Sequence, residues 1–201
     1  SIKADRIVLA CNGYLENLEK SLTSKILPMN NYIVATKPLD DETVQKINPK
    51  DIAFADSRFV INYFRMSADK RLLFGGGENY SQELSKNIVP IVTRPLEKIY
   101  PFLKGIKIDY AWGGKLAITM NRLPFFASLH NEKVISAQGY SGQGVALASY
   151  SGKIVSEKIT GTGEVFDIMS KIPRPSFPGG RFLRNPSMKI GMLYYSLLDR
   201  I

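Results

Sequence analysis

The stretch VISAQGYSGQGVALASYSGKIVSEKIT, residues 134–160, contains the strongest local signal for the fold. The mostly apolar residues 134–138 are typical of a short buried strand, and residues 145–159 have the apolar spacing of a helix. Between them lies a turn with glycine at positions 139, 142 and 144, where the backbone can turn sharply because no side chain blocks it. The stretch therefore predicts a strand, a tight turn and a helix.

The start of that helix suits a ligand that carries or develops negative charge. Helix N-termini present unpaired N–H groups and the positive end of the helix dipole. The glycine spacing, G-x-x-G-x-G, is neither that of a dinucleotide fingerprint nor that of a Walker A loop. A strand–turn–helix corner without any ligand remains the alternative interpretation of the motif by itself.

Short strands and helices alternate irregularly along the chain, which predicts the α+β class. Strands are expected at 28–36, 59–66, 71–74, 106–112 and 123–128, and helices at 15–24, 41–47 and 86–103. The strand at 71–74 is expected to end at the glycines 75–77. Pro90 and Pro95 indicate that the third helix begins late or is kinked.

The first residues predict a strand that belongs inside a larger sheet. The apolar run 7–10 is followed by Cys11-Asn12-Gly13, which is typical of a buried parallel strand breaking into a turn. We therefore expect sheet partners for it outside these 201 residues, with a short leader as the alternative. Cys11 is expected to be buried.

Composition excludes several classes of protein. The 201 residues include 44% hydrophobic residues, so the chain can bury an ordinary core and is not expected to be disordered. A lone cysteine excludes an internal disulfide framework and any multi-cysteine metal site, and we expect no metal. No apolar run approaches the ~18–20 residues of a membrane span. The composition favours a reducing compartment, and we expect the cytoplasm.

Three aromatic or basic positions are candidates for ligand contacts. Tyr63 and Arg65 are two residues apart in a predicted strand and so share a face, where they could hold an amine or a carboxylate. Trp112, the one tryptophan, precedes two glycines and could flank a planar cofactor. An ordinary cross-strand pair and core packing are the alternatives. His130, the single histidine, lies in a polar turn and is expected at the surface.

Several ordered motifs together resemble one family. They are residues 7–15, the block YFRMS…RLLFGGG at 63–77, IDYAWGG at 108–114, NRLP at 121–124, QGYSGQGV at 138–145 and FPGG at 177–180. In this combination the chain resembles the C-terminal half of a D-amino-acid-oxidase-type flavoprotein, in the gamma-glutamylputrescine oxidase branch. The resemblance covers essentially the whole chain.

The resemblance implies an FAD-dependent oxidation of a C–N bond in an amine or amino acid. It implies that Asn12 and Gly13 line the FAD cleft and that Trp112, Gly113 and Gly114 approach the isoalloxazine. A further set, at the pyrimidine end of the flavin, consists of Gly139, Tyr140, Ser141, Gly142, Gln143, Gly144 and Val145. Tyr63, Arg65 and Trp112 would contact substrate, and no residue is expected to act as a dedicated catalytic acid or base.

Two departures from the family pattern refine these expectations. Relatives with covalent flavin attach it through a cysteine near Trp112, and this stretch has none, so noncovalent FAD is expected. Gln143 stands where close relatives often have histidine. Arg65 and Lys115 are possible carboxylate contacts, and the substrate is expected to be a γ-glutamyl-polyamine or a similar amine.

The resemblance also predicts the domain organisation. Residues 1–27 would end an FAD-binding lobe, 28–118 would form a substrate-binding domain with a mixed or antiparallel sheet, and 119–201 would return to the FAD-binding lobe and end in a C-terminal helix at 192–198. The G-x-G-x-x-G lobe of the family is absent from these residues, so we expect the chain alone to be inactive.

The charge of the chain motivates a rival hypothesis. The net charge is +9, and in residues 101–201 basic residues outnumber acidic ones by 13 to 6. Lys171, Arg174, Arg181, Arg184 and Lys189 are unopposed by acidic residues, with aromatic residues interleaved. Such a segment could bind nucleic acid or an anionic surface, although no nucleic-acid motif accompanies it. We expect these residues instead to face the absent lobe or the FAD phosphates.

Overall fold

The computed structural model of the chain describes residues 1–58, 61–79, 83–180, 183, 186–187 and 190–191. The expected C-terminal helix at 192–198 and the basic residues Arg181, Arg184 and Lys189 lie outside the described residues. Two compact units are formed, the first from 1–29 and 115–187 and the second from 30–114 together with the described residues 190–191. The expected domain organisation, with boundaries after 27 and after 118, stays a prediction.

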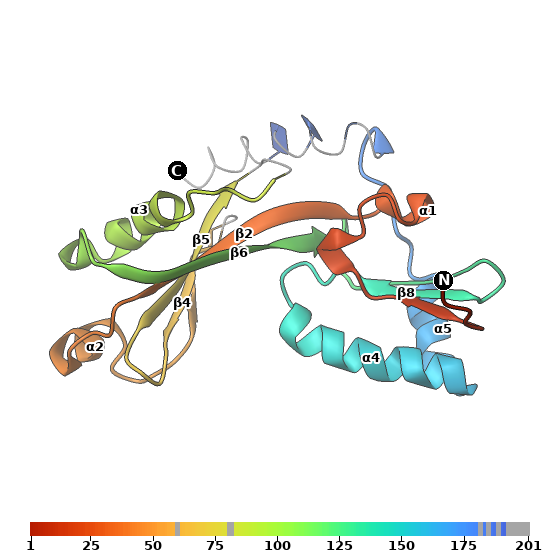
Figure 1. Cartoon of the computed structure of the whole chain (residues 1–201), viewed down its shortest axis with the longest axis horizontal. Coiled ribbons are helices and arrows are strands. Elements are labelled where there is room, and N and C mark those ends of the chain that lie inside the picture. The colour runs from red at the N-terminus through yellow and green to blue at the C-terminus, as the bar shows by residue number, and fades with distance from the viewer. Residues whose placement is uncertain (59–60, 80–82, 181–182, 184–185, 188–189, 192–201) are drawn as a thin grey trace. The chain divides into compact units, whose positions relative to one another are not determined.

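The first unit contains a three-stranded sheet in the order β1-β8-β7 (Figure 1). β1 (Ile7–Leu9) runs parallel to β8 (Val134–Gln138), and β7 (Phe125–Leu129) is antiparallel to β8. The helices are α1 (Lys20–Thr23), α4 (Gly144–Thr160) and α5 (Glu164–Lys171), and a 3₁₀ turn, η1, covers Asn12–Tyr14. The predicted strand, turn and helix at 134–160 are therefore present.

Side-chain alternation along β8 divides the core of the first unit into two clusters. Ile135 and Ala137 pack with α4 and α5 residues, including the fully buried Phe166. Val134 contacts a second cluster that contains Leu9 and Phe125. Successive residues of a strand point to opposite faces, so this one strand contributes to both clusters.

The two predictions about the N-terminal residues have different outcomes. Within the described residues β1 has one hydrogen-bonded neighbour, and Ile7 and Val8 are 53% and 44% exposed, so burial by further strands outside this chain stays a prediction. The helix expected at 15–24 is confined to α1. Glu16 has a left-handed φ of 48°, which interrupts a helix, and the Glu19 side chain accepts the N–H of Ser21 and caps the short helix that follows.

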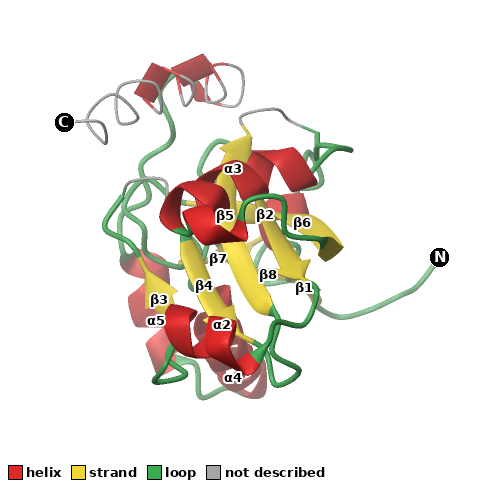
Figure 2. Ribbon diagram, turned by 90° about the vertical axis from the view of Figure 1, so that its left-hand side faces the viewer, coloured by secondary structure: helices red, strands yellow, loops and turns green. Residues whose placement is uncertain are grey.

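The second unit contains a five-stranded sheet in the order β3-β4-β5-β2-β6 (Figure 2). The strands are β2 (Leu27–Thr36), β3 (Phe54–Ala55), β4 (Tyr63–Met66), β5 (Leu72–Asn79) and β6 (Ile108–Ile118). β3 with β4, β4 with β5, and β5 with β2 pair antiparallel. The predicted α+β class, with mixed and antiparallel sheets, is confirmed.

The helices of the second unit pack on one face of this sheet. α2 (Asp41–Ile47), α3 (Val89–Ile99) and the 3₁₀ turn η2 (Pro101–Leu103) contribute buried residues to the same cluster as the strand residues Tyr32, Val34 and Phe74. α3 begins three residues later than the expected range, with Pro90 in its first turn. The face of the sheet opposite this core is called the open face below.

Candidate functional site

The turn between β8 and α4 is fixed from inside the first unit. Gly139 has φ +75°, and a Cβ there would lie 2.6 Å from Cγ2 of Thr119. Ser141, also left-handed, donates its N–H to the carbonyl of Ala117 at 2.9 Å. Tyr140 is 8% exposed and donates its hydroxyl hydrogen to the carbonyl of Ala137 at 3.0 Å. Gly139 and Tyr140 are therefore occupied by internal packing.

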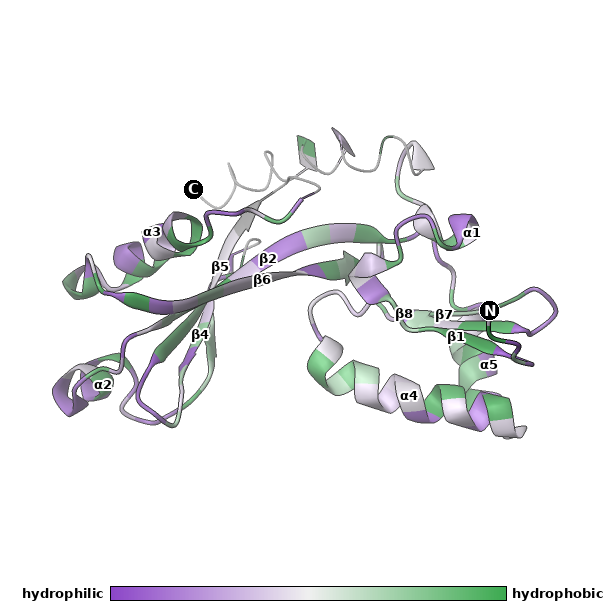
Figure 3. Cartoon of the chain, viewed as in Figure 1, coloured by the Kyte–Doolittle hydropathy of each residue, from purple (hydrophilic) through white to green (hydrophobic). Residues whose placement is uncertain are grey.

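The second half of the turn is open. Gly142 has φ +96°, and a Cβ there would meet no atom of the described residues within 4 Å. Gln143 is exposed and makes no side-chain cap to α4, and no acidic residue lies in the first turn of that helix. Val145 is 98% exposed at the apolar start of the helix (Figure 3). The accessible part of the predicted motif is therefore residues 142–145, where free helix N–H groups are expected.

Asn12 joins the first predicted cofactor segment to this turn. Its Oδ1 accepts the N–H of Gly139 at 3.2 Å. The neighbouring Gly13 packs against β6, because a Cβ at Gly13 would lie 2.4 Å from the carbonyl oxygen of Lys115. The Tyr14 hydroxyl accepts the N–H of Lys115 at 3.1 Å, and its ring lies beneath the Lys115 ammonium. The structure thus brings Asn12 and the glycine turn together, and sequence reasoning did not foresee the contact with Lys115.

Gln138 is a polar residue that sequence reasoning missed. Its side chain is fully buried, and within the described part of the chain neither its Oε1 nor its Nε2 has a hydrogen-bond partner. A buried amide without partners costs free energy unless a further polar group reaches it. The available signal was a glutamine in an otherwise apolar strand, directly before Gly139. The uncapped start of α4, rather than this buried amide, fits a group with negative charge.

Two of the predicted substrate residues, Tyr63 and Arg65, lie on the open face of the second unit's sheet. Tyr63 pairs with Gly75 and Arg65 with Leu73, while the intervening Phe64 packs in the core beneath the helices. On β6 a Cβ at Gly113 would lie 2.5 Å from the core residue Tyr32, so Gly113 faces the core. Trp112, the residue before it, is 45% exposed. Tyr63 and Arg65 therefore share one face of one sheet.

The ring of Tyr63 crosses this face over a glycine. A Cβ at Gly75 would lie 2.2 Å from the Tyr63 ring atoms, so only a residue without a side chain leaves room for the ring. The Tyr63 hydroxyl donates to Oδ1 of Asn31, on β2, at 2.5 Å. The expectation that glycines 75–77 end the strand is wrong, since β5 continues to Asn79. The three glycines lie within the strand, where atoms of other residues of the second unit approach it closely.

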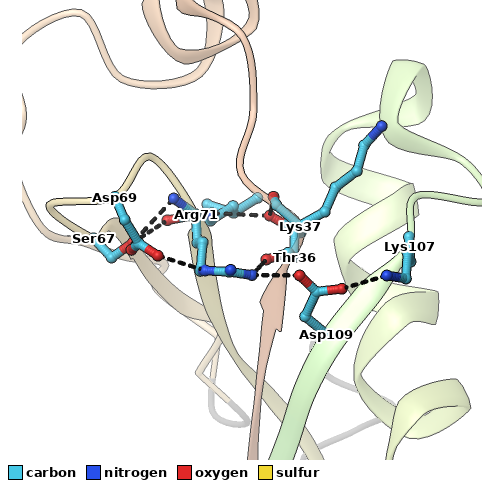
Figure 4. Close-up of polar contacts among 8 residues, drawn as sticks. Thr36, Lys37, Ser67, Asp69, Arg71, Lys107 and Asp109 are labelled. Atoms are coloured by element: carbon cyan, nitrogen blue, oxygen red, sulfur yellow. Dashed lines mark hydrogen bonds and ion pairs between the residues drawn. The ribbon is translucent and has the colours of Figure 1, made fainter.

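Arg65 and Arg71 differ in whether their charge is paired with acidic side chains. Arg65 is exposed and donates one hydrogen bond, from Nε to its neighbour's carbonyl, that of Met66, at 3.2 Å. Arg71 is enclosed by ion pairs at 2.6 Å with both Asp69 and Asp109 (Figure 4). Of the two arginines, Arg65 is the one whose charge can serve a ligand.

The Arg71 cluster ties together the ends of three strands. Arg71 also donates to the carbonyl of Thr36 at 2.9 Å, and Lys107 contacts Asp109 at 3.0 Å (Figure 4). Hydrogen bonds donated by Arg71 and then by Lys107 lower the pKa of Asp109, and the bonds that Arg71 donates to Asp109 and then to Asp69 raise the pKa of Arg71. Every charge in the cluster has a partner of opposite sign, so the cluster has a structural role.

The single histidine and the single cysteine take no part in this site. His130 is at the surface, as expected, and its Nε2 lies 2.8 Å from Oε2 of Glu19. Hydrogen bonds from His130 and then Ser21 lower the pKa of Glu19 to about 2. Cys11 is partly exposed at the edge of a core cluster, so the expectation that it is buried is wrong. In the described part of the chain no helix is long and apolar enough to cross a membrane.

Comparison with known sequences identifies related enzymes. A family model described as FAD dependent oxidoreductase matches residues 1–158. The chain is 35% identical over its whole length to gamma-glutamylputrescine oxidoreductase of Escherichia coli and 40% identical to the probable oxidoreductase OrdL of Rhizobium meliloti. It spans 47% and 46% of these two proteins, about half their length.

Solved structures show the same fold. Glycine oxidase from Bacillus cereus matches with a TM-score of 0.61 at 15% identity, over 85% of this chain and 47% of its own. L-proline dehydrogenase from P. horikoshii matches with a TM-score of 0.57 at 22% identity, over 84% of this chain and 44% of its own. None of these similarities supports the rival hypothesis of a nucleic-acid or anionic-surface binding module.

Proposed function

Because the chain belongs to the family of FAD-dependent oxidoreductases, we propose that it supplies the substrate face and part of the flavin surface of an enzyme that oxidises the C–N bond of an amine. The observation that carries the proposal is the common face of Tyr63 and Arg65. The chain spans about half the length of its relatives, so the other contacts to FAD would come from the rest of such a protein, and the chain alone would be inactive.

The first unit would hold the flavin without a covalent bond. Asn12 and Gly13 would line the cofactor cleft, and Gly142 would allow the backbone to approach the cofactor closely. The start of α4, at Gly144 and Val145, would stabilise negative charge that develops at the pyrimidine edge of the ring, since helix N–H groups point there. The other members of this set would be Gly139, Tyr140, Ser141 and Gln143. Trp112, Gly113 and Gly114 would approach the isoalloxazine.

The second unit would bind and orient the substrate. Tyr63 and Trp112 present aromatic surface that disfavours a charged amine by desolvation and so favours its neutral form. Arg65 would hold a carboxylate elsewhere on the substrate. When bound, FAD accepts the hydride that leaves carbon as the C–N bond becomes a C=N bond. No side chain needs to act as a catalytic acid or base if the amine is neutral at that moment.

The substrate we propose is γ-glutamylputrescine or a similar γ-glutamyl-polyamine, which would place the protein in polyamine breakdown in the cytoplasm. The support is the 35% identity over the whole chain to a gamma-glutamylputrescine oxidoreductase. The Tyr63–Arg65 pair, with one neutral and one cationic group on the same face, is compatible with such a molecule.

The test uses the complete polypeptide that contains this chain. We expect the purified protein to be yellow, with flavin absorbance bands, and to lose those bands when γ-glutamylputrescine is added without oxygen. Release of FAD on denaturation with acid would confirm the noncovalent bond. A colourless protein, or one whose DNA binding falls steeply with salt, would contradict the proposal.

A further inference from the structure

The hydroxyl hydrogen of Tyr63 is donated to another residue of the chain. It is donated to Oδ1 of Asn31 at 2.5 Å, on the face where substrate is proposed to bind. A phenol has a single hydroxyl hydrogen, so toward any further partner the oxygen of Tyr63 acts as an acceptor. An acceptor suits the N–H of an amine, whereas a carboxylate needs a donor.

Neighbouring contacts hold Asn31 in place. The flanking residues Asn30 and Tyr32 are 2% and 0% exposed. Nδ2 of Asn30 donates to the carbonyl of Glu83 at 2.7 Å, and the hydroxyl of Tyr32 accepts the N–H of Ser85 at 2.9 Å. The register of β2 against β5 shifts between Asn30 and Tyr32, where two steps along β2 face three along β5. Asn31 is therefore fixed by its backbone on both sides.

The ring of Tyr63 is constrained as well. It lies over Gly75, where a Cβ would approach its atoms to 2.2 Å. The glycine lets the ring cross β5, from β4 toward β2, so that the hydroxyl reaches Asn31. Three strands thus set the position of one oxygen atom: β4 carries the ring, β5 makes room for it, and β2 takes its hydrogen.

We propose that Asn31 is a positioning residue that makes Tyr63 a hydrogen-bond acceptor and so selects substrates that present an N–H group at this point. The proposal rests on the proposed function, because it assumes that the open face binds the substrate. It assigns different tasks to the two neighbours on β4. Tyr63 would accept from the amine, and Arg65, which has donors only, would bind the carboxylate.

A double-mutant cycle in the flavin-loaded, complete protein tests this. The variants are Asn31→Ala, Tyr63→Phe and both together, with Asn31→Asp as the conservative variant that can only accept. The probes are γ-glutamylputrescine, for KM and kcat, and acetate, an acceptor without N–H groups, for its dissociation constant from changes in the flavin spectrum.

Loss of one hydrogen bond is expected to raise the amine KM about tenfold in Asn31→Ala, with kcat within about twofold, and Asn31→Asp should restore it. Acetate should bind equally well or more tightly to Asn31→Ala, because the released hydroxyl hydrogen can now be donated. In the Tyr63→Phe background, Asn31→Ala should have no further effect on either probe.

The proposal would be overturned if Asn31→Ala weakened the binding of both probes equally. It would also be overturned if Asn31→Ala had the same effect in the Tyr63→Phe background as in the unmodified protein. A merely structural role of Asn31 predicts both results. If Asn31→Ala does not fold, Tyr63→Phe decides: it must weaken the amine and leave acetate unchanged. Failure of the proposed function can be told apart from this result, because it is seen in the unmodified protein. That protein would contain no flavin, or a flavin that the amine does not reduce. In that case the Asn31 proposal fails as well.

Discussion

Two glycine-rich stretches, 75–77 in β5 and 139–144 before α4, look alike in sequence and differ in space. At Gly75 and Gly77 a Cβ would lie 2.2 and 2.4 Å from other atoms of the same unit. At Gly142 it would meet nothing within 4 Å in the part of the chain that the structure describes. Glycines of the first kind are required by internal packing, whereas an open glycine with a left-handed φ leaves space that a ligand can use.

The largest expected effect is at Gly77. A Cβ there meets the carbonyl oxygen of Ile91, in the backbone of α3, and φ is +67°, so Gly77→Ala combines a clash with backbone strain. We expect the free energy of unfolding to fall by about 3–5 kcal/mol, measured by denaturant unfolding. Gly105→Ala is the matched control, with φ +74° and no atom within 4 Å, and should cost far less. Equal losses of unfolding free energy in the two variants would show that backbone strain, without the clash, explains the effect of Gly77→Ala.

Gly75→Ala should have a smaller effect, because the group in the way is the Tyr63 ring rather than backbone. We expect a loss of about 1–3 kcal/mol in the free energy of unfolding as the ring is displaced. Its hydrogen bond to Asn31 should be lost with it, so the amine KM should rise as in Asn31→Ala. A variant with a weakened fold and an unchanged KM would separate the packing role of Gly75 from the site.

Gly142 tests the other side of the comparison. We expect Gly142→Leu to weaken FAD binding by about tenfold or more, by blocking close approach of the backbone, as measured by fluorescence on dilution of the holoprotein. Gly161→Leu is the control, since Gly161 ends α4 with φ +94° and also has nothing within 4 Å. Similar FAD affinities in the two variants would remove Gly142 from the cofactor site.

The smallest expected effect is on the pH dependence of stability of the first unit, which contains the open turn at 142–145. The pKa of Glu19 is about 2 in the folded chain, against 4.5 ordinarily, because His130 and Ser21 donate to its carboxylate. A lowered pKa means that this contribution to stability is present above about pH 4.5 and is lost as the pH falls toward 2. Unfolding midpoints measured across that window should depend less on pH in Glu19→Gln than in the unmodified chain. An identical pH dependence would contradict the contact.

Local sequence patterns predicted the elements near the site well. The apolar run and glycines at 134–144 located β8, the turn and α4, and the range 41–47 matched α2, because each signal lies within one element. The glycines 75–77 were misjudged because the groups that require them, the Tyr63 ring and α3, lie elsewhere in the sequence.

The features of the candidate site also divide into those that the sequence predicted and those that only the structure revealed. Spacing alone placed Tyr63 and Arg65 on one face, because strand geometry alternates residue by residue. Only the packed structure shows that Asn31, 32 residues earlier in the chain, accepts the Tyr63 hydroxyl hydrogen and that Asn12 reaches Gly139. The same holds for Gln138, which is buried without a hydrogen-bond partner among the described residues. Hydrogen-bond roles depend on atoms that meet across strands, and long-range pairing decides which atoms those are.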